Sequence, residues 1–292
     1  MSSVAFGLSF LASVQGALVQ VTNFGSNPTA LEMYVDLPEN VTSNAPVILA
    51  LHGCGGSAQR YYGQNNLAAV GTSRGAIMIY PSATDSTHCW DSGTPKSLTR
   101  DGGGDTQGLV QMVQYVLSEY NADPARVFAV GRSSGAMMSN ALAAVYPDVF
   151  AATSVYSGVA AGCMAVPEGV PANPMETCAK GNVTKTAQEW GETVRSYNPG
   201  YEGPYPRMQI WHGTSDVVVV YHNLIEELKE WSAVHDVPFT RNVTSTPQAD
   251  YTQMIYGDGS RLVGYSAVGV GHVVPEHESE TMAWFGISSA AQ

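Results

Sequence analysis

The 292-residue sequence has few charged side chains and no concentration of basic ones. Charged residues make up 13% of the chain, and 25 acidic against 13 basic residues give a formal net charge of −12. Nucleic acids and anionic membrane surfaces repel such a protein, because no cluster of Lys and Arg offsets its charge. We therefore expect neither of them as a partner. Neutral small molecules and neutral polymers remain compatible with this composition.

Long hydrophobic runs are absent after the N-terminal segment. No later apolar stretch approaches the roughly 18 residues that span a membrane. The first sixteen residues, MSSVAFGLSFLASVQG, carry no charge and have an apolar centre from Val4 to Val14. Small residues at positions 14 and 16 fit a signal-peptidase site before Ala17. We predict a secretory signal over residues 1–16, although its usual basic start is missing. The alternative is a buried N-terminal strand or helix.

Cysteine is scarce, and no pair of cysteines or histidines has the spacing of a metal site. We therefore expect no metal. An even number of cysteines in an exported chain predicts two disulfides with three possible pairings among Cys54, Cys89, Cys163 and Cys178. Export also agrees with Asn-Val-Thr triplets, which are predicted N-glycosylation acceptors at Asn40, Asn182 and Asn242.

Short apolar runs alternate with helical patterns along the chain. Several runs are continuously apolar, which is typical of strands covered on both faces in a parallel sheet. They are residues 31–37, 47–51, 76–80, 127–130, 152–156 and 208–211. Helical stripes occupy residues 104–120 and 224–231, the second with Glu226, Glu227 and Glu230 expected on its outer face. The pattern predicts an α/β fold with a mostly parallel sheet.

The domain organisation is expected to be simple. The sequence shows no internal repeat and no linker rich in Ser, Thr or Pro. The loop-rich residues 160–186 are too few for a domain, so we interpret them as an excursion of the same domain. Residues 17–292 are therefore predicted to form one domain, with no small appended module that has cysteines of its own.

The stretch FAVGRSSGAMMSNALAA contains a G-x-S-x-G pattern centred on Ser133. An apolar run precedes it, and a helical pattern over residues 136–144 follows. A sharp turn between strand and helix exposes the central hydroxyl, and the flanking glycines let strand and helix approach closely. We predict that Ser133 is a nucleophile; the alternative is a tight structural turn.

A serine nucleophile needs a base and an acid, which follow it in the order acid, then histidine, in the α/β-hydrolase fold. His272 lies in a glycine-bracketed turn, GVGHVV, and is the predicted base, whereas the other histidines are interpreted as structural or solvated. Asp216 leaves the strand at residues 208–211 and is the predicted acid. The alternatives are a turn or helix-cap role for Asp216, with the acid at Asp236, Asp250 or Asp258.

An oxyanion hole is expected from the loop HGCGG that follows the strand at residues 47–51. Glycines there let backbone N–H groups point inward, and the fold expects a second donor from the residue after the nucleophile. These rules predict the backbone amides of Cys54 and Ser134.

Taken together, these motifs resemble the secreted esterases of carbohydrate esterase family one, which includes fungal feruloyl esterases and acetylxylan esterases. Esterases similar to polyhydroxybutyrate depolymerases are related to them. The resemblance covers most of the chain through the segments HGCGGSAQ, CWD, GGD, GRSSGAMM, VYSGVAAGC, TAQEWG, PRMQIWHGTSD and GVGHVVP. It implies a secreted, extracellular serine esterase that needs no cofactor and acts on xylan.

The resemblance also implies roles for particular residues. It makes Ser133, Asp216 and His272 the catalytic triad. It implies the disulfides Cys54–Cys89 and Cys163–Cys178, the first of which would tie the oxyanion loop to the CWD segment. Trp90 would then lie near the acyl pocket as a substrate-binding residue, or pack in the core.

Two departures from the family pattern bear on the substrate. Arg132 stands where relatives have a smaller or apolar residue, and it is expected either to touch substrate or to pair with an acid. Acetylxylan-type members resemble HxCTG in the oxyanion loop, whereas HGCGG is more similar to the feruloyl type. We therefore expect feruloyl esters as substrates. Acetylated xylan, a hydroxyalkanoate polyester and a non-catalytic binding role are the alternatives, although no segment indicates the exposed apolar face that a polyester would require.

Overall fold

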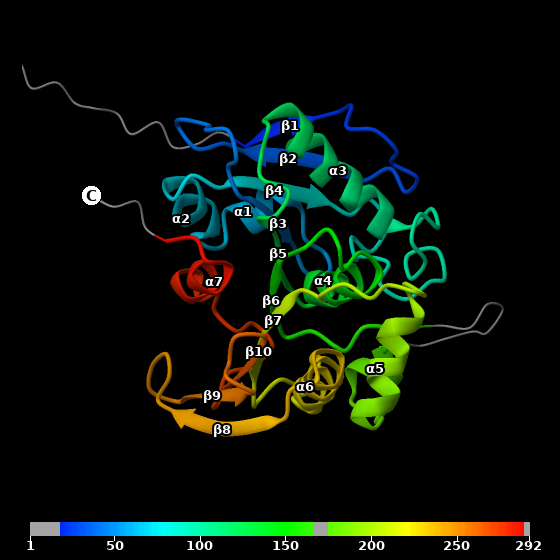
Figure 1. The fold of residues 1–292 in the computed structure, drawn as a ribbon, viewed down its shortest axis with the longest axis vertical. Coiled ribbons are helices and arrows are strands. Elements are labelled where there is room, and N and C mark those ends of the chain that lie inside the picture. The colour runs from blue at the N-terminus through cyan, green and yellow to red at the C-terminus, as the bar shows by residue number, and fades with distance from the viewer. Residues whose placement is uncertain (1–17, 166–174, 289–292) are drawn as a thin grey trace, which may run out of the picture.

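The structure is a computed structural model that describes residues 18–165 and 175–288, so the predicted signal at residues 1–16 lies outside the described residues. Its strands form one sheet in the order β1-β2-β4-β3-β5-β6-β7-β10-β9-β8 (Figure 1). They are β1 (Val19–Val21), β2 (Glu32–Asp36), β3 (Val47–Leu51), β4 (Ile77–Ser82), β5 (Val127–Arg132), β6 (Ala152–Tyr156), β7 (Arg207–Gly213), β8 (Phe239–Thr244), β9 (Tyr251–Tyr256) and β10 (Leu262–Ala267).

The centre of the sheet is parallel, as the continuous apolar runs predict. Strands β4, β3, β5, β6, β7 and β10 pair in parallel, while β1, β2, β9 and β8 add antiparallel pairs at the two edges. Every residue of β3 and β6 is buried, because helices cover both faces of these strands. The predicted fold class is confirmed.

Helices pack on both faces of the sheet. They are α1 (Ala58–Tyr62), α2 (Leu67–Ser73), α3 (Asp105–Glu119), α4 (Ser134–Val145), α5 (Ala187–Ser196), α6 (His222–His235) and α7 (Glu278–Phe285), with a π-helical turn, η1 (Met175–Ala179). Helices α1, α2 and α7 lie on one face, and α3, α4 and α6 on the other (Figure 1). Helix α5 packs on α6 and so forms an outer layer. None of the helices in the described ranges combines the length and apolar character needed to cross a bilayer.

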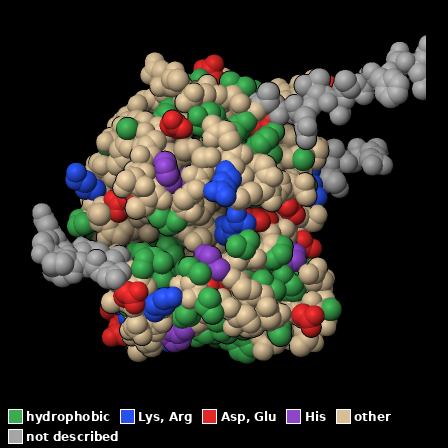
Figure 2. Space-filling model, turned by 180° about the vertical axis from the view of Figure 1, so that it is seen from behind, with side chains coloured by type: hydrophobic (Ala, Val, Ile, Leu, Met, Phe, Trp, Pro, Cys, Tyr) green, Lys and Arg blue, Asp and Glu red, His purple; other side chains and the backbone are tan. Residues whose placement is uncertain are grey.

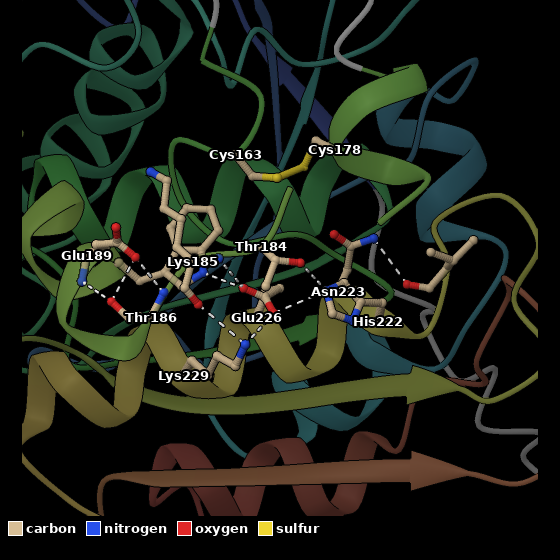
Figure 3. Close-up of polar contacts among 12 residues, drawn as sticks. Cys163, Cys178, Thr184, Lys185, Thr186, Glu189, His222, Asn223, Glu226 and Lys229 are labelled. Carbon is tan, nitrogen blue, oxygen red and sulfur yellow. Dashed lines mark hydrogen bonds and ion pairs between the residues drawn. A yellow bond between two sulfur atoms is a disulfide. The ribbon is translucent and has the colours of Figure 1, made fainter. Parts of the chain in front are cut away.

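The position of α5 corrects one expectation. Glu226, Glu227 and Glu230 were expected on the solvent side of α6, but all three are buried. Glu227 faces α4, where the side-chain amide of Asn140 donates to it, and Glu230 accepts from the backbone amide of Ala161. Glu226 lies on the side of α6 that α5 and the segment before it cover, and Figure 3 shows it among the polar contacts there. The Nζ of Lys229 and the Nε1 of Trp190 donate to its carboxylate at 2.7 and 2.8 Å. A single apolar stripe therefore underestimates the burial of a helix that is covered twice.

The surface agrees with the charge distribution of the sequence. On the face drawn in Figure 2, acidic and basic side chains lie scattered among uncharged surface, and hydrophobic side chains form small patches between them. This face therefore offers nothing like the broad basic surface that binds a nucleic-acid backbone.

Candidate active site

Ser133 occupies a strained turn between β5 and α4. Its φ of 56° and ψ of −121° place a non-glycine residue at positive φ, which persists only where the surrounding structure enforces it. The flanking glycines explain how. A Cβ on Gly131 would collide with the carbonyl group of Gly135, and a Cβ on Gly135 would collide with the carbonyl of Leu51. The strand and the helix can therefore meet only with glycine at both positions, and the turn between them presents the Ser133 hydroxyl.

A continuous hydrogen-bond path connects the three residues that the sequence singles out. The Oγ of Ser133 lies 2.9 Å from the Nε2 of His272, and the Nδ1 of His272 lies 2.7 Å from the Oδ2 of Asp216. Asp216 follows β7, and His272 follows β10, the strand that pairs with β7 in parallel. The three side chains thus lie together at the carboxyl ends of the parallel strands β5, β7 and β10.

Asp216 is held as a carboxylate in a buried position. Burial alone raises the pKa of this carboxyl, but hydrogen bonds from His212, from His272 and from the amide of Val218 together lower it well below its usual value. The amides of Val218 and Val219 donate to Oδ1 at 2.9 and 3.0 Å. The carboxylate can therefore fix the orientation of the His272 ring and stabilise its protonated form.

His212 is a residue whose connection to the site the sequence analysis missed. It is fully buried in β7, and its Nε2 lies 3.4 Å from the Oδ2 of Asp216 and 2.8 Å from the carbonyl oxygen of Val219. The available signal was its spacing, four residues before Asp216 at the end of the same strand.

The loop after β3 supplies one wall of a cleft beside Ser133. Cys54 lies in this wall. Ser134 is the first residue of α4, so its N–H group has no acceptor within the helix. The two residues whose amides are expected in an oxyanion hole are therefore a residue of the cleft that contains Ser133 and the residue that follows Ser133.

Disulfide Cys54–Cys89 fixes this loop from the side, and the amide of Gly55 donates to the carbonyl oxygens of Thr87 and His88. The second disulfide joins Cys163 to Cys178 (Figure 3). Both pairings agree with those implied by the resemblance.

Trp90 lies beneath the cleft and is absent from its lining. It is 4% exposed, its Nε1 donates to the carbonyl oxygen of His52 at 2.8 Å, and its backbone amide donates to the Oγ of Ser134 at 2.8 Å. The structure therefore favours the core-packing alternative, in which Trp90 braces the oxyanion loop against the start of α4. The second serine of the motif contributes its hydroxyl to this brace.

Arg132 lines the cleft and pairs with an acid. Its guanidinium lies 3.4 Å from a carboxylate oxygen of Glu276, donates to the Oε1 of Gln64 at 2.7 Å, and sits 5.6 Å from the centre of the Tyr61 ring. Burial raises the pKa of Glu276, and the charge of Arg132 opposes that shift. Arg132 therefore contributes both an ion pair and part of the cleft surface.

The cleft has a volume of about 370 Å³ and contains the reactive groups at its base. Its lining mixes backbone, cationic and apolar groups: His52, Gly53, Cys54, Gly55, Gly56, Arg60, Tyr61, Gln64, Arg132, Ser133, Val218, His272 and Val273. Such a cleft suits a ligand with both an apolar part and polar groups.

The predicted glycosylation acceptors all lie at the surface. The side chains of Asn40, Asn182 and Asn242 are exposed. The side-chain Nδ2 of Asn182 donates to the carbonyl oxygen of Glu176 at 2.8 Å. Their modification stays a prediction.

Comparisons with known proteins agree with this geometry. The family model described as esterase PHB depolymerase matches residues 31–227, which include Ser133 and Asp216. Feruloyl esterase B of Talaromyces stipitatus is 47% identical over 93% of this chain and 76% of the relative. A probable acetylxylan esterase A of Neosartorya fischeri is 42% identical over 99% of this chain and 79% of the relative.

A solved structure shows the same fold. The acetyl xylan esterase from Aspergillus awamori superimposes with a TM-score of 0.90 at 41% identity, covering 94% of this chain and all of that one. The family model, the curated relatives and the shared fold agree. The chain therefore belongs to the esterase PHB depolymerase family, and it is a carboxylic ester hydrolase with an α/β-hydrolase fold.

Proposed function

We propose that the protein is a secreted serine esterase that removes acyl groups from plant cell-wall xylan, with feruloyl esters as its preferred substrates. The observation that carries the esterase mechanism is the hydrogen-bond path from Ser133 through His272 to Asp216 at the base of the cleft. The support for the feruloyl preference is the group of feruloyl esterase B relatives at 45–47% identity, against 41–43% for the acetylxylan esterases.

The geometry supports a two-step mechanism. His272 takes the proton of Ser133 through Nε2 while Oγ attacks the ester carbonyl carbon, and Asp216 stabilises the resulting imidazolium. The backbone amides of Cys54 and Ser134 donate to the oxyanion, each contributing about 2.7–4 kcal/mol of transition-state stabilisation. His272 then gives the proton to the departing sugar alcohol. Water, activated by the same histidine, hydrolyses the acyl-enzyme and restores the serine.

The nucleophile is tested by replacing Ser133 with alanine. Removal of the hydroxyl is expected to lower kcat for methyl ferulate by at least about 10⁴-fold, because no acyl-enzyme can form. Circular dichroism verifies that the variant is folded. A folded variant with near wild-type activity would refute the assignment. Failure of the wild-type protein to react with a serine-directed phosphonate would instead favour the non-catalytic alternative.

The acyl group is tested by comparing substrates. A feruloyl ring needs an apolar surface near the triad, and Val218 and Val273 supply one at the rim of the cleft. We expect faster release of ferulate from methyl ferulate than of acetate from acetylated xylan at equal enzyme concentration. Strong acetyl release without ferulate release would establish the acetylxylan alternative, which the structural similarity to the Aspergillus enzyme supports.

The exposed valines also keep the polyester alternative open. No exposed apolar face was expected from the sequence, yet Val217, Val218, Val268 and Val273 are 75%, 41%, 58% and 60% exposed. They lie in the loops that carry Asp216 and His272. Release of hydroxy acids from a hydroxyalkanoate film at a rate above that of ferulate release would favour this substrate.

Secretion is supported by the two disulfides, which form and persist in oxidising compartments. Expression of the full chain in a fungal host should deliver the protein to the medium with Ala17 at its N-terminus. Retention of residues 1–16 in the cell-associated protein would contradict this.

A further inference from the structure

A second cavity lies at the amino ends of the central strands, whereas Ser133 lies at their carboxyl ends. It has a volume of about 680 Å³ and is lined by residues that precede or begin β5, β6, β7 and β10. These four strands are parallel neighbours, so their amino ends lie side by side. Ser133, Asp216 and His272 follow the carboxyl ends of β5, β7 and β10. Strands of five to seven residues separate the two sites by on the order of 20 Å.

This cavity is locally positive in an acidic protein. Arg207 and Arg261 line it, and within the described residues neither has a carboxylate within ion-pair distance. The lining carboxylate, Asp148, is already neutralised by Arg100, which donates two hydrogen bonds at 2.6 and 2.9 Å. Hydrogen bonds lower the pKa of Asp258 and the charge of Arg261 contributes to that shift, but these two side chains do not form an ion pair in the described residues. Both guanidinium groups can therefore donate hydrogen bonds to an anion.

Arg207 is also held in place. Its guanidinium lies 5.0 Å from the centre of the Trp284 ring, a cation–π contact that fixes the side chain in the absence of an anion. Because guanidinium presents its donors in a planar fork, a fixed arginine is suited to bind a carboxylate through two parallel hydrogen bonds.

Two further polar groups in the lining have no partner. His235 is 7% exposed, and within residues 18–165 and 175–288 neither its Nε2 nor the buried Oη of Tyr205 has a hydrogen-bond partner. Burial and the nearby charge of Arg261 lower the pKa of His235 to about 4, so its ring is neutral at ordinary pH. Burying a polar atom without a partner is unfavourable, and a ligand hydroxyl at this position would supply the missing hydrogen bond.

We propose that this cavity binds a uronic acid, a sugar ring that carries a carboxylate. The carboxylate would pair with Arg207 and Arg261, and ring hydroxyls would meet His235 and Tyr205. The ring of Tyr201, held by a 2.9 Å hydrogen bond from its Oη to the carbonyl oxygen of Pro204, offers an apolar surface to the sugar face. The choice of ligand rests on the proposed function, because uronic acids are the anionic side groups of xylan. The site would anchor the polymer away from the cleft.

The test measures binding without hydrolysis. Wild-type protein is titrated calorimetrically with de-esterified xylo-oligosaccharides that carry a glucuronic acid side group, and with neutral oligosaccharides of the same length. We expect a Kd of about 1 mM for the acidic ligand. The neutral one should bind at least about tenfold more weakly, because it lacks the carboxylate that would form charge-assisted hydrogen bonds with the two arginines.

Variants connect the binding to the cavity. Arg207→Gln and Arg261→Gln should each weaken binding of the acidic ligand about tenfold, and Tyr205→Phe should weaken it by a smaller factor. Lys96→Gln is the matched control, because it also removes one exposed positive charge but lies outside the cavity. It should leave Kd unchanged.

Three results would overturn the proposal: equal affinity for neutral and acidic oligosaccharides, equal affinity for ferulate, or no binding up to about 10 mM, a concentration well above the expected Kd. Methyl ferulate hydrolysis by the same preparations keeps the two proposals separate. The arginine variants should hydrolyse it at the wild-type rate. An active enzyme that fails to bind the acidic ligand refutes the second site alone.

Discussion

Asp216 and Glu227 are both carboxyl groups with fully buried side chains, yet the protein shifts their pKa values in opposite directions. Asp216 receives hydrogen bonds or close contacts from two histidines and two backbone amides, and its pKa falls well below its usual value. Glu227 receives one hydrogen bond, from the amide of Asn140 at 2.7 Å, and burial raises its pKa to about 8. For Asp216, hydrogen bonds and the nearby charge of His272 outweigh desolvation, whereas for Glu227 the single hydrogen bond does not.

Asp216 belongs to the site beside Ser133, whereas Glu227 belongs to the packed interior around α6. A charged Asp216 can orient and stabilise an imidazolium, whereas a protonated Glu227 behaves as a neutral polar group between α4 and α6. Glu230 belongs with Glu227, because burial raises its pKa and the backbone amide of Ala161 donates to it. Glu276 lies between the two cases: it is buried, but Arg132 provides one charged partner.

The largest effect on activity is expected for Asp216→Asn. An asparagine keeps the size of the side chain but cannot stabilise the imidazolium or fix the same tautomer of His272, so kcat should fall about 10⁴-fold. The measurement is the kcat for methyl ferulate. Asp258→Asn, which changes an exposed carboxylate in a turn, should retain full activity. A loss smaller than tenfold in the Asp216 variant would contradict the role of this carboxylate.

The second test is Glu227→Gln, which should affect stability and leave activity intact. The native pKa of about 8 lies above the usual value of 4.5. Folding therefore retains a proton that the unfolded chain loses, and the stability from this group is complete below pH 4.5 and is lost as the pH rises towards 8. The corresponding slope is about 1.4 kcal/mol of unfolding free energy per pH unit.

Urea unfolding at several pH values between 5 and 8 measures this slope. The Glu227→Gln variant should lose less stability per pH unit than the wild type, because glutamine does not titrate. Glu119→Gln, at the exposed end of α3, is the control and should retain the wild-type slope. Identical slopes in all three proteins would show that Glu227 is ionised in the native state.

The smallest effect is expected for Glu276→Gln. This change removes the charged partner of Arg132 but keeps a hydrogen-bond acceptor. Because the described contacts of the Arg132 guanidinium are with Glu276 and with Gln64 and Tyr61 in the wall of the cleft, KM for methyl ferulate should change by less than about tenfold while kcat is preserved. Glu280→Gln is the control in the same segment. A large drop in kcat would mean that the ion pair holds the reacting groups themselves.

The site was largely predictable where its signals are local. The turn at Ser133 is encoded by a strand, two glycines and a helix that follow one another directly in the sequence. Asp216 follows from its place after a predicted strand, and His272 from the order of acid and histidine and from its glycine-bracketed turn. The strand before His272, β10, was not predicted. The histidine at position 212 could have been found from its spacing to Asp216, since both lie at the end of one strand.

Features that depend on distant segments were not predictable. The outward placement of the α6 glutamates was wrong because periodicity describes one helix alone. Helix α5 and the segment before it cover Glu226, while α4 and the loop after β6 cover Glu227 and Glu230. The Arg132–Glu276 pair joins β5 to the segment before α7, and nothing in either sequence neighbourhood indicates the other. The strand β8 (Phe239–Thr244) was missed because its residues are mostly polar and exposed, so they lack the alternation of a half-buried strand.

This last strand has a consequence for the protein in concentrated solution. It ends the described sheet and leaves a row of backbone donors and acceptors open to another molecule (Figure 1). Open edges promote intermolecular strand pairing and aggregation, which charged side chains and bulges counteract. The register shift between Phe239 and Arg241, together with the charge of Arg241, supplies both. Colloidal stability therefore depends on a strand that takes no part in ester hydrolysis.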